Sequence, residues 1–297
     1  MVPLAVLCAL VSSLLYALAS VLQHRAAIAQ PAAANMRLGL LARLVRNPIW
    51  LMGIVFDALA YGLQFIALGH GSMVLVQPLL VCGLLFALPL GAWLAGSRMT
   101  SRDWWGAAAV IVGLAAFLVI ASPGRGHAEV ADHQWVALFL VTGPVIAGLV
   151  LAAQRGNSRS RATLLAAGAA INYGVTAALT KAAAHLLAAG VGELLESWEL
   201  YVLIGAGLLG MLMAQSAFQS GELDASLPVL TVVDPIASVL IGAFLFGEGV
   251  RSGLAATTIE CLALVVLTAG VFALSKAEVV RATHEETTGA PDPAGAG

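Results

Sequence analysis

Long apolar runs, each followed by a short polar segment, set the pattern of this chain. Nearly every run has a stretch of about 20 residues without charge, the length that an α-helix needs to cross the hydrocarbon core of a membrane. The runs show no alternation of period two, which excludes a barrel of transmembrane strands. The pattern predicts an all-α, polytopic membrane protein of about nine helices: Pro3 to Gln23, Ile49 to Leu68, Met73 to Ala95, Trp104 to Ala121, Gln134 to Ala153, Thr163 to about Ala189, Leu200 to Phe218, Ala225 to Phe246 and Gly253 to Ser275.

The polar segments divide the chain further. Residues 24–47 carry several arginines and no acid, and the spacing of their leucines predicts a stretch that lies partly on the membrane surface. Residues 276–297 are polar and end in GAPDPAGAG, a composition typical of a disordered tail. We therefore expect a transmembrane domain at 1–275, followed by a disordered cytoplasmic tail.

One apolar stretch occurs twice, as Gln64 to Gly96 and as Ala214 to Gly247. The matched positions are Ala67 with Ala217, Gly71 with Gly221, Pro78 with Pro228 and, after a slip of one residue, GAWLAG with GAFLFG. Tyr16 and Tyr173 begin a second match, between the first and sixth spans. Residues 1–122 are thus expected to repeat as 163–275, with 134–153 as a connector helix. Because five spans separate equivalent points, the two four-helix copies should run in opposite directions, as the repeats of many carriers do.

Composition agrees with lipid as the main solvent of the chain. Hydrophobic residues make up 60% and charged residues 10%, whereas a soluble domain carries about a quarter charged residues. The sequence has no row of basic residues that could bind along a nucleic acid backbone, so nucleic acid is not an expected partner. Cys8, Cys82 and Cys261 lie singly in apolar spans and are expected to be buried thiols. The sequence holds no nucleophile elbow, phosphate-binding loop or zinc motif, so we expect neither an enzyme nor a cofactor.

Loop charges predict the orientation. Arginines gather in the first, third and fifth loops, whereas the second, fourth and sixth loops carry only Arg125. Because arginine and lysine are enriched in cytoplasmic loops, we expect the protein to lie in the cell membrane with its N-terminus outside the cell and its C-terminus in the cytoplasm.

Ionisable residues within the spans are the candidates for function, because burying them in lipid is costly. Asp57, Tyr61 and Gln64 share one face of the second span by their spacing. Pro235 follows Asp234 in mid-span, where it can free a backbone carbonyl toward a cavity. The residues expected to bind substrate or couple its transport are Tyr16, Asp57, Tyr61, Gln64, Tyr173, Lys181, Gln215, Asp234 and Glu260. A structural alternative is that Lys181 pairs with Asp234 or Glu260 and simply locks the bundle.

Two segments resemble a known superfamily. Asp234-Pro235 followed by the run Ile241 to Glu248, IGAFLFGE, resembles the EamA-type drug/metabolite transporters, whose repeats often end in Gly-Glu. The segment Ala67 to Leu79 is similar to the NIPA-like magnesium transporters of the same superfamily, which also have about nine spans. The resemblance covers most of residues 1–275. It departs at Gly96-Ser97, where Gly-Glu is usual, and at Tyr61, where the NIPA-like proteins carry an acid.

These features favour an alternating-access secondary transporter that moves a small solute along a path between the two repeats. Asp57 or Glu260 is a candidate for coupling transport to protons. One alternative is a divalent cation permease with Asp57, Asp234 and Glu260 as ligands. The other is a membrane scaffold or regulator without transport activity. The expected partners are a small-molecule or ion substrate and the lipid bilayer, with a homodimer left open and no nucleic acid.

Overall fold

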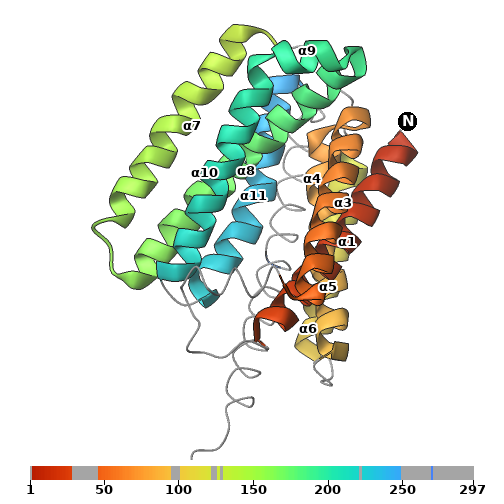
Figure 1. The fold of residues 1–297 in the computed structure, drawn as a ribbon, viewed down its shortest axis with the longest axis vertical. Coiled ribbons are helices and arrows are strands. Elements are labelled where there is room, and N and C mark those ends of the chain that lie inside the picture. The colour runs from red at the N-terminus through yellow and green to blue at the C-terminus, as the bar shows by residue number, and fades with distance from the viewer. Residues whose placement is uncertain are drawn as a thin grey trace, which may run out of the picture.

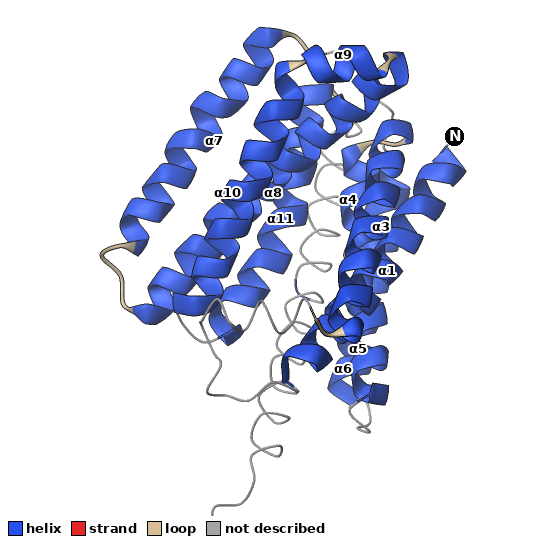
Figure 2. Cartoon of the chain, viewed as in Figure 1, coloured by secondary structure: helices blue, strands red, loops and turns tan. Residues whose placement is uncertain are grey.

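The computed structural model describes residues 2–28, 46–94, 101–121, 126–127, 130–220, 223–248 and 269. Within these ranges the chain forms α-helices joined by loops and turns, without a strand (Figure 2). The all-α prediction is therefore confirmed for this part of the chain. Of the expected surface stretch at 24–47, residues 24–28 continue the first helix and residues 29–45 lie outside the described residues. The tail from Lys276 and, apart from residue 269, the ninth span also lie outside them.

The helices follow the predicted spans closely. They are α1 (Val2–Ile28), α3 (Pro48–His70), α4 (Met73–Leu80), α5 (Cys82–Leu94), α6 (Ser101–Ala121), α7 (Asp132–Ala153), α8 (Ser158–Ala189), α9 (Val191–Glu196), α10 (Trp198–Ser220) and α11 (Leu223–Phe246). Five of the described helices, α1, α3, α7, α8 and α11, contain segments that are long and apolar enough to cross a membrane. Shorter apolar segments occur in α4 with α5, in α6 and in α10.

Side chains next to the apolar runs decide where several helices begin. The Asn47 carboxamide accepts a hydrogen bond from the N–H of Ile49 at 2.9 Å, and Pro48 takes the first helical position of α3. The Asn157 carboxamide accepts from the N–H of Ser160 at 2.8 Å at the start of α8. Both are ordinary N-caps, which satisfy backbone donors that the helix itself leaves free.

The third predicted span is interrupted. α4 ends at Leu80, α5 begins at Cys82, and Val81 lies between them in a turn. Pro78 has no N–H, so it cannot continue the helical hydrogen bonds, and the N–H of Val81 bonds to the carbonyl of Pro78 at 3.2 Å in a tighter turn. The result is a pair of half-helices where the apolar pattern predicts one continuous helix.

Two groups of helices make up the described fold (Figure 1). In the first group, α1 packs against α3, α4 and α5. Small residues permit the close approach: a Cβ at Gly53 would lie 2.7 Å from Cγ of Gln23, and the Ser12 hydroxyl donates to the carbonyl of Ala60 at 2.7 Å. Such contacts are typical of helices in lipid, where close packing replaces the hydrophobic effect as the main attraction.

In the second group, α8 packs against α7, α10 and α11. A Cβ at Gly174 of α8 would lie 3.1 Å from the backbone nitrogen of Ser238 on α11, so these two helices also approach closely. The Asn172 carboxamide donates to the carbonyl of Ala206 at 2.7 Å, which ties α8 to α10. α8 is the most buried of the five candidate membrane spans, because it packs against α7, α10 and α11 of its own group and against α3 of the other group.

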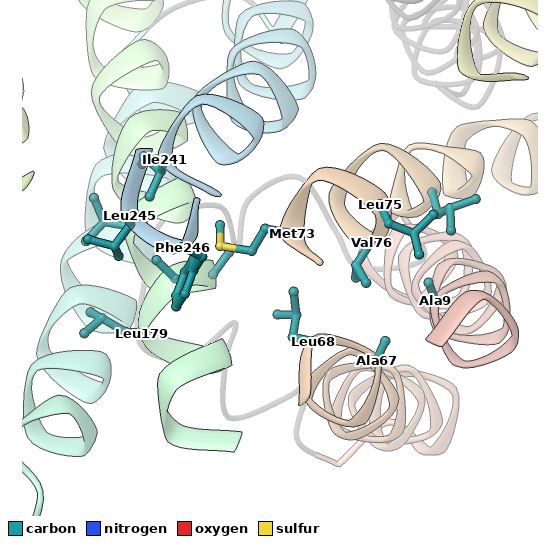
Figure 3. Packing of buried hydrophobic residues seen from close by; sticks show 14 of the residues in the cluster. Ala9, Ala67, Leu68, Met73, Leu75, Val76, Leu179, Ile241, Leu245 and Phe246 are labelled. Atoms are coloured by element: carbon teal, nitrogen blue, oxygen red, sulfur yellow. The ribbon is translucent and has the colours of Figure 1, made fainter. Parts of the chain in front are cut away.

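The groups meet along α3 and α4 on one side and α8 and α11 on the other. Buried apolar side chains from both groups form one core, in which Met73 of α4 faces Phe246 at the end of α11 (Figure 3). Leu68 and Leu179 lie on either side of the same contact. Only Gly71 and Ser72 separate α3 from α4, so the turn between them is tight. This turn packs closely against α1, because a Cβ at Gly71 would lie 2.7 Å from Cβ of Ala5.

Candidate functional site

Polar side chains gather where the two helix groups meet. We call them the polar seam, which comprises Tyr16, Gln23, Asp57, Tyr61, Gln64, Thr180, Lys181, Asp234, Ser238 and Glu248. Hydrogen bonds and an ion pair link these side chains in small sets. The apolar helices thus pair these groups with one another, as a low-dielectric surrounding requires.

A buried ion pair between Lys181 and Glu248 lies at one end of the polar seam, and we call it the latch. The two side chains are 1% and 0% exposed. Glu248 also accepts hydrogen bonds from the backbone N–H groups of Met73 at 2.8 Å and Val74 at 2.9 Å, at the start of α4. The Lys181 ammonium lies 4.5 Å from the centre of the Phe246 ring. The latch therefore joins α8 and the end of α11 to a helix of the other group through charge-assisted hydrogen bonds.

The local sequence after α11 places Glu248 in the latch. Gly247 has a φ of +58°, the left-handed conformation that favours glycine, and it turns the chain back at the helix end. The N–H of His127 donates to the carbonyl of Phe246 at 2.7 Å and so satisfies one of the last carbonyls of α11. Gly242 leaves room for the carboxylate, because a Cβ there would lie 2.8 Å from Oε2 of Glu248.

Asp57, Tyr61 and Gln64 of α3 each have a different partner. The Tyr16 hydroxyl donates to Oε1 of Gln64 at 2.9 Å, and Nε2 of Gln23 donates to Oδ2 of Asp57 at 2.5 Å. Both bonds join α1 to α3 within the first helix group. The shared face that the spacing predicts thus exists, and α1 covers two of its three residues.

Tyr61 crosses the boundary between the groups. Its hydroxyl lies 3.2 Å from Oγ1 of Thr180 on α8. Because Thr180 donates its own hydrogen to the carbonyl of Thr176 at 2.7 Å, the Tyr61 hydroxyl is the donor. Thr180 directly precedes Lys181, so this bond lies beside the latch.

Asp234 contributes a partly buried carboxylate from α11. Its Oδ1 accepts a hydrogen bond from the Ser238 hydroxyl at 3.2 Å. Tyr16 and Tyr173, the two tyrosines at matching positions of the sequence repeat, both lie within electrostatic range of Asp234. Tyr16 also lies within range of Asp57, so the carboxylates of the two groups share a neighbour.

Lys181 forms an ion pair with Glu248, which is not among its expected partners. Among the described residues no ion pair joins Lys181 to Asp234, one of the two partners that the sequence suggests. Glu260, the other expected partner, lies outside the described residues, and so does the side chain of Gln215. Glu248 stands just beyond an apolar run and is not among the site residues expected from the sequence; the local signal for it is an acidic residue directly after a helix-ending glycine.

The seam holds no evident metal centre in the part of the chain that the structure describes. There, no three His, Cys, Asp or Glu side chains gather so that they could hold a metal ion. Cys8 and Cys82 are buried free thiols, as predicted, and Cys261 lies outside the described residues. The Gln77 carboxamide on α4 is a further buried polar group, and its Nε2 has no hydrogen-bond partner among the described residues.

The charged groups of the seam differ in how their charges are balanced. The latch charges satisfy each other, whereas Asp57 and Asp234 are partly buried and accept only the neutral donors named above among the described residues. These carboxylates place acceptors on both sides of the boundary between the groups, whereas the hydroxyls of Tyr16 and Tyr61 already donate to Gln64 and Thr180. None of them is arranged with a base and an oxyanion site as a nucleophilic catalyst would be.

The described residues form an all-α fold, with five helices that are long and apolar enough to cross a membrane. The chain belongs to the same family as the uncharacterized protein Cgl0250/cg0304 of Corynebacterium glutamicum, with which it is 35% identical over 246 residues. The match covers 82% of this chain and 85% of that protein. No protein-family profile matches the chain. No solved structure matches it either.

Proposed function

We propose that this protein is a secondary transporter of the drug/metabolite type, which moves a small solute across the cell membrane by alternating access. The observation that carries the proposal is the gathering of polar and ionisable side chains at the boundary between two helix groups. In helices surrounded by lipid such groups are costly, and they commonly mark solute or ion pathways.

Corresponding helix contacts support an inverted repeat as the basis of transport. α1 packs against α3 and α5, and α8 packs against α10 and α11. In the sequence match, α8 corresponds to α1, and α11 corresponds to α4 with α5. The half-helices α4 and α5 add a second feature common among carriers, whose sites are often built from discontinuous helices.

The latch is the proposed gate at the outer end of the path. The loop charges predict that the turns before α4 and after α11 face outward, and Glu248 and Met73 lie at these turns. Asp57 and Gln23 lie nearer the opposite ends of their helices. Opening the gate would separate α4 from α8 and α11, while the pairs within each group stay intact.

Two alternatives make different predictions. A divalent cation permease needs several oxygen ligands around one ion, and the described residues hold no such cluster. A scaffold without transport activity would keep the seam closed on both sides at all times. The transporter proposal instead requires that solvent reach the seam from one side and then from the other.

Cysteine labelling tests this access without a known substrate. In a background free of native cysteines, Gln64→Cys places a thiol on the seam, and a membrane-impermeant maleimide is applied to intact cells and to inverted vesicles. With Glu248 intact, we expect the maleimide to react from the cytoplasmic side. When Glu248→Gln opens the gate, reaction from the outer side should increase. Leu59→Cys is the matched control, because Leu59 lies on the same helix and is 53% exposed on its outer surface; in lipid it should not react from either side.

Labelling of Gln64→Cys from neither side in both backgrounds would favour the scaffold and end the transporter proposal. If access alternates, solutes that stabilise the purified protein against heat are then tested for uptake into proteoliposomes. Mg²⁺ belongs in that screen, and rescue of a strain deficient in magnesium uptake would favour the permease.

A further inference from the structure

A groove runs along the outside of the second helix group. α7 and α10 each pack against α8, and α7 lies at the edge of the group (Figure 1). The groove between them has a volume of about 770 Å³ and is mostly apolar. It lies away from the polar seam, so it does not belong to the proposed transport path.

The walls of the groove suit a hydrocarbon chain. Ile146 and Val150 of α7 face Leu209 and Met213 of α10, with Val175 of α8 between them. Along α7 the lining extends from Phe139 to Ala153, which at the rise of an α-helix is about 21 Å. That length exceeds one half of a bilayer's hydrocarbon core, about 15 Å.

One end of the groove is basic. Arg161, in the first turns of α8, and Gln154 line it there. Arg155 lies in the connection between α7 and α8, and Arg159 lies in the first turn of α8. The loop charges predict that this connection lies on the cytoplasmic side, where anionic lipids attract basic segments. An apolar groove that ends at an arginine at the membrane surface matches the two parts of a phospholipid.

We propose that this groove binds an anionic phospholipid, with an acyl chain between α7 and α10 and the headgroup phosphate at Arg161. Guanidinium groups bind phosphate through paired hydrogen bonds, which favours an anionic headgroup over a zwitterionic one whose own cation competes. The assignment does not depend on the transport proposal, because none of the groove residues named here belongs to the seam.

Two glycines allow the groove to be filled without disturbing the fold. A Cβ at Gly143 of α7 or Gly205 of α10 would meet no atom within 4 Å, and both residues line the groove. Gly148 and Gly207 lie on the same two helices and are equally open, but they are not among the groove residues. Gly143→Leu and Gly205→Leu should therefore block the acyl chain, with Gly148→Leu and Gly207→Leu as matched controls.

The experiment counts lipids on the full-length protein by native mass spectrometry after incubation with dioleoylphosphatidylglycerol or dioleoylphosphatidylcholine. We expect phosphatidylglycerol to be retained about fivefold better than phosphatidylcholine, and Arg161→Gln to remove that preference, as the loss of one basic contact predicts. Arg46→Gln, an exposed arginine at the start of α3, is the charge control. Gly143→Leu and Gly205→Leu should each lower retention of both lipids, whereas their controls should match the native protein.

Retention by both leucine variants equal to that of their controls would overturn the groove as the site. A preference that survives Arg161→Gln would overturn the assignment of the headgroup. A dimer that Gly205→Leu dissociates would show that a second copy fills the groove and would overturn the lipid proposal. Two groove positions are used so that the test stands if one variant fails to fold.

Discussion

The latch allows a quantitative test of how the two helix groups are held together. Glu248→Gln keeps the size of the side chain but removes the negative charge beside Lys181. The carboxylate accepts from two backbone N–H groups, whereas a carboxamide has one oxygen, so one of these donors would face an NH₂ group. Removing one partner of a buried ion pair costs about 3–5 kcal/mol. We expect a loss in that range in the free energy of unfolding.

Lys181→Met should cost somewhat less, because Glu248 keeps the N–H groups of Met73 and Val74 at the start of α4. The double variant removes both charges and should be less destabilised than the sum of the single variants, with a coupling energy of roughly 2–3 kcal/mol. The measurement is reversible unfolding in mixed micelles with a rising fraction of SDS, followed by circular dichroism. Glu196→Gln, an exposed residue of α9, is the control and should change stability by less than about 0.5 kcal/mol.

Additive effects of the two single variants would refute a direct, energetically coupled pair. A loss of less than about 1 kcal/mol for Glu248→Gln would contradict a main contribution of this carboxylate to stability, because breaking a buried ion pair is expected to cost several kcal/mol. Either result would also remove the latch as the proposed gate.

Further predictions concern contacts between and within the helix groups. Tyr61→Phe removes the hydrogen bond to Thr180 and should lower the free energy of unfolding by about 0.5–1.5 kcal/mol in the same micelle titration. Gly210→Ala places a Cβ 2.6 Å from Nδ2 of Asn172 and should destabilise by about 1–3 kcal/mol through overpacking of α8 against α10. Gly207→Ala has open space and should be neutral or stabilising by up to about 1 kcal/mol; an equal loss for both glycines would contradict close packing at Gly210.

The helices could be predicted from the sequence because their signals are local. Asn47 and Asn157 stand directly before apolar runs, and they cap α3 and α8 as such residues usually do. The interruption at Val81 was missed although Pro78 was visible, because a proline in an apolar helix is often accommodated by a kink. Whether the helix bends or breaks depends on its neighbours, and at Gly83 a Cβ would lie 3.2 Å from the carbonyl oxygen of Ser13 on α1.

The site was predicted in part. Spacing along α3 correctly put Asp57, Tyr61 and Gln64 on one face, since side-chain direction within a helix follows from its period. It could not show that α1 would cover two of them while Tyr61 reached α8. The buried position of Lys181 was expected, but its partner was not.

Length and lack of charge alone predict the five long apolar helices that could cross a membrane, α1, α3, α7, α8 and α11, because a segment in lipid must satisfy its own backbone hydrogen bonds. The partners of a buried ion pair cannot be predicted from such local features. Lys181 and Glu248 are separated by 67 residues, and Glu248 lies 175 residues from Met73. No local pattern encodes such a meeting, because it depends on how α8, α11 and α4 pack around one another. The tertiary structure therefore decides which buried charges neutralise each other and which carboxylates have only neutral hydrogen-bond partners among the described residues.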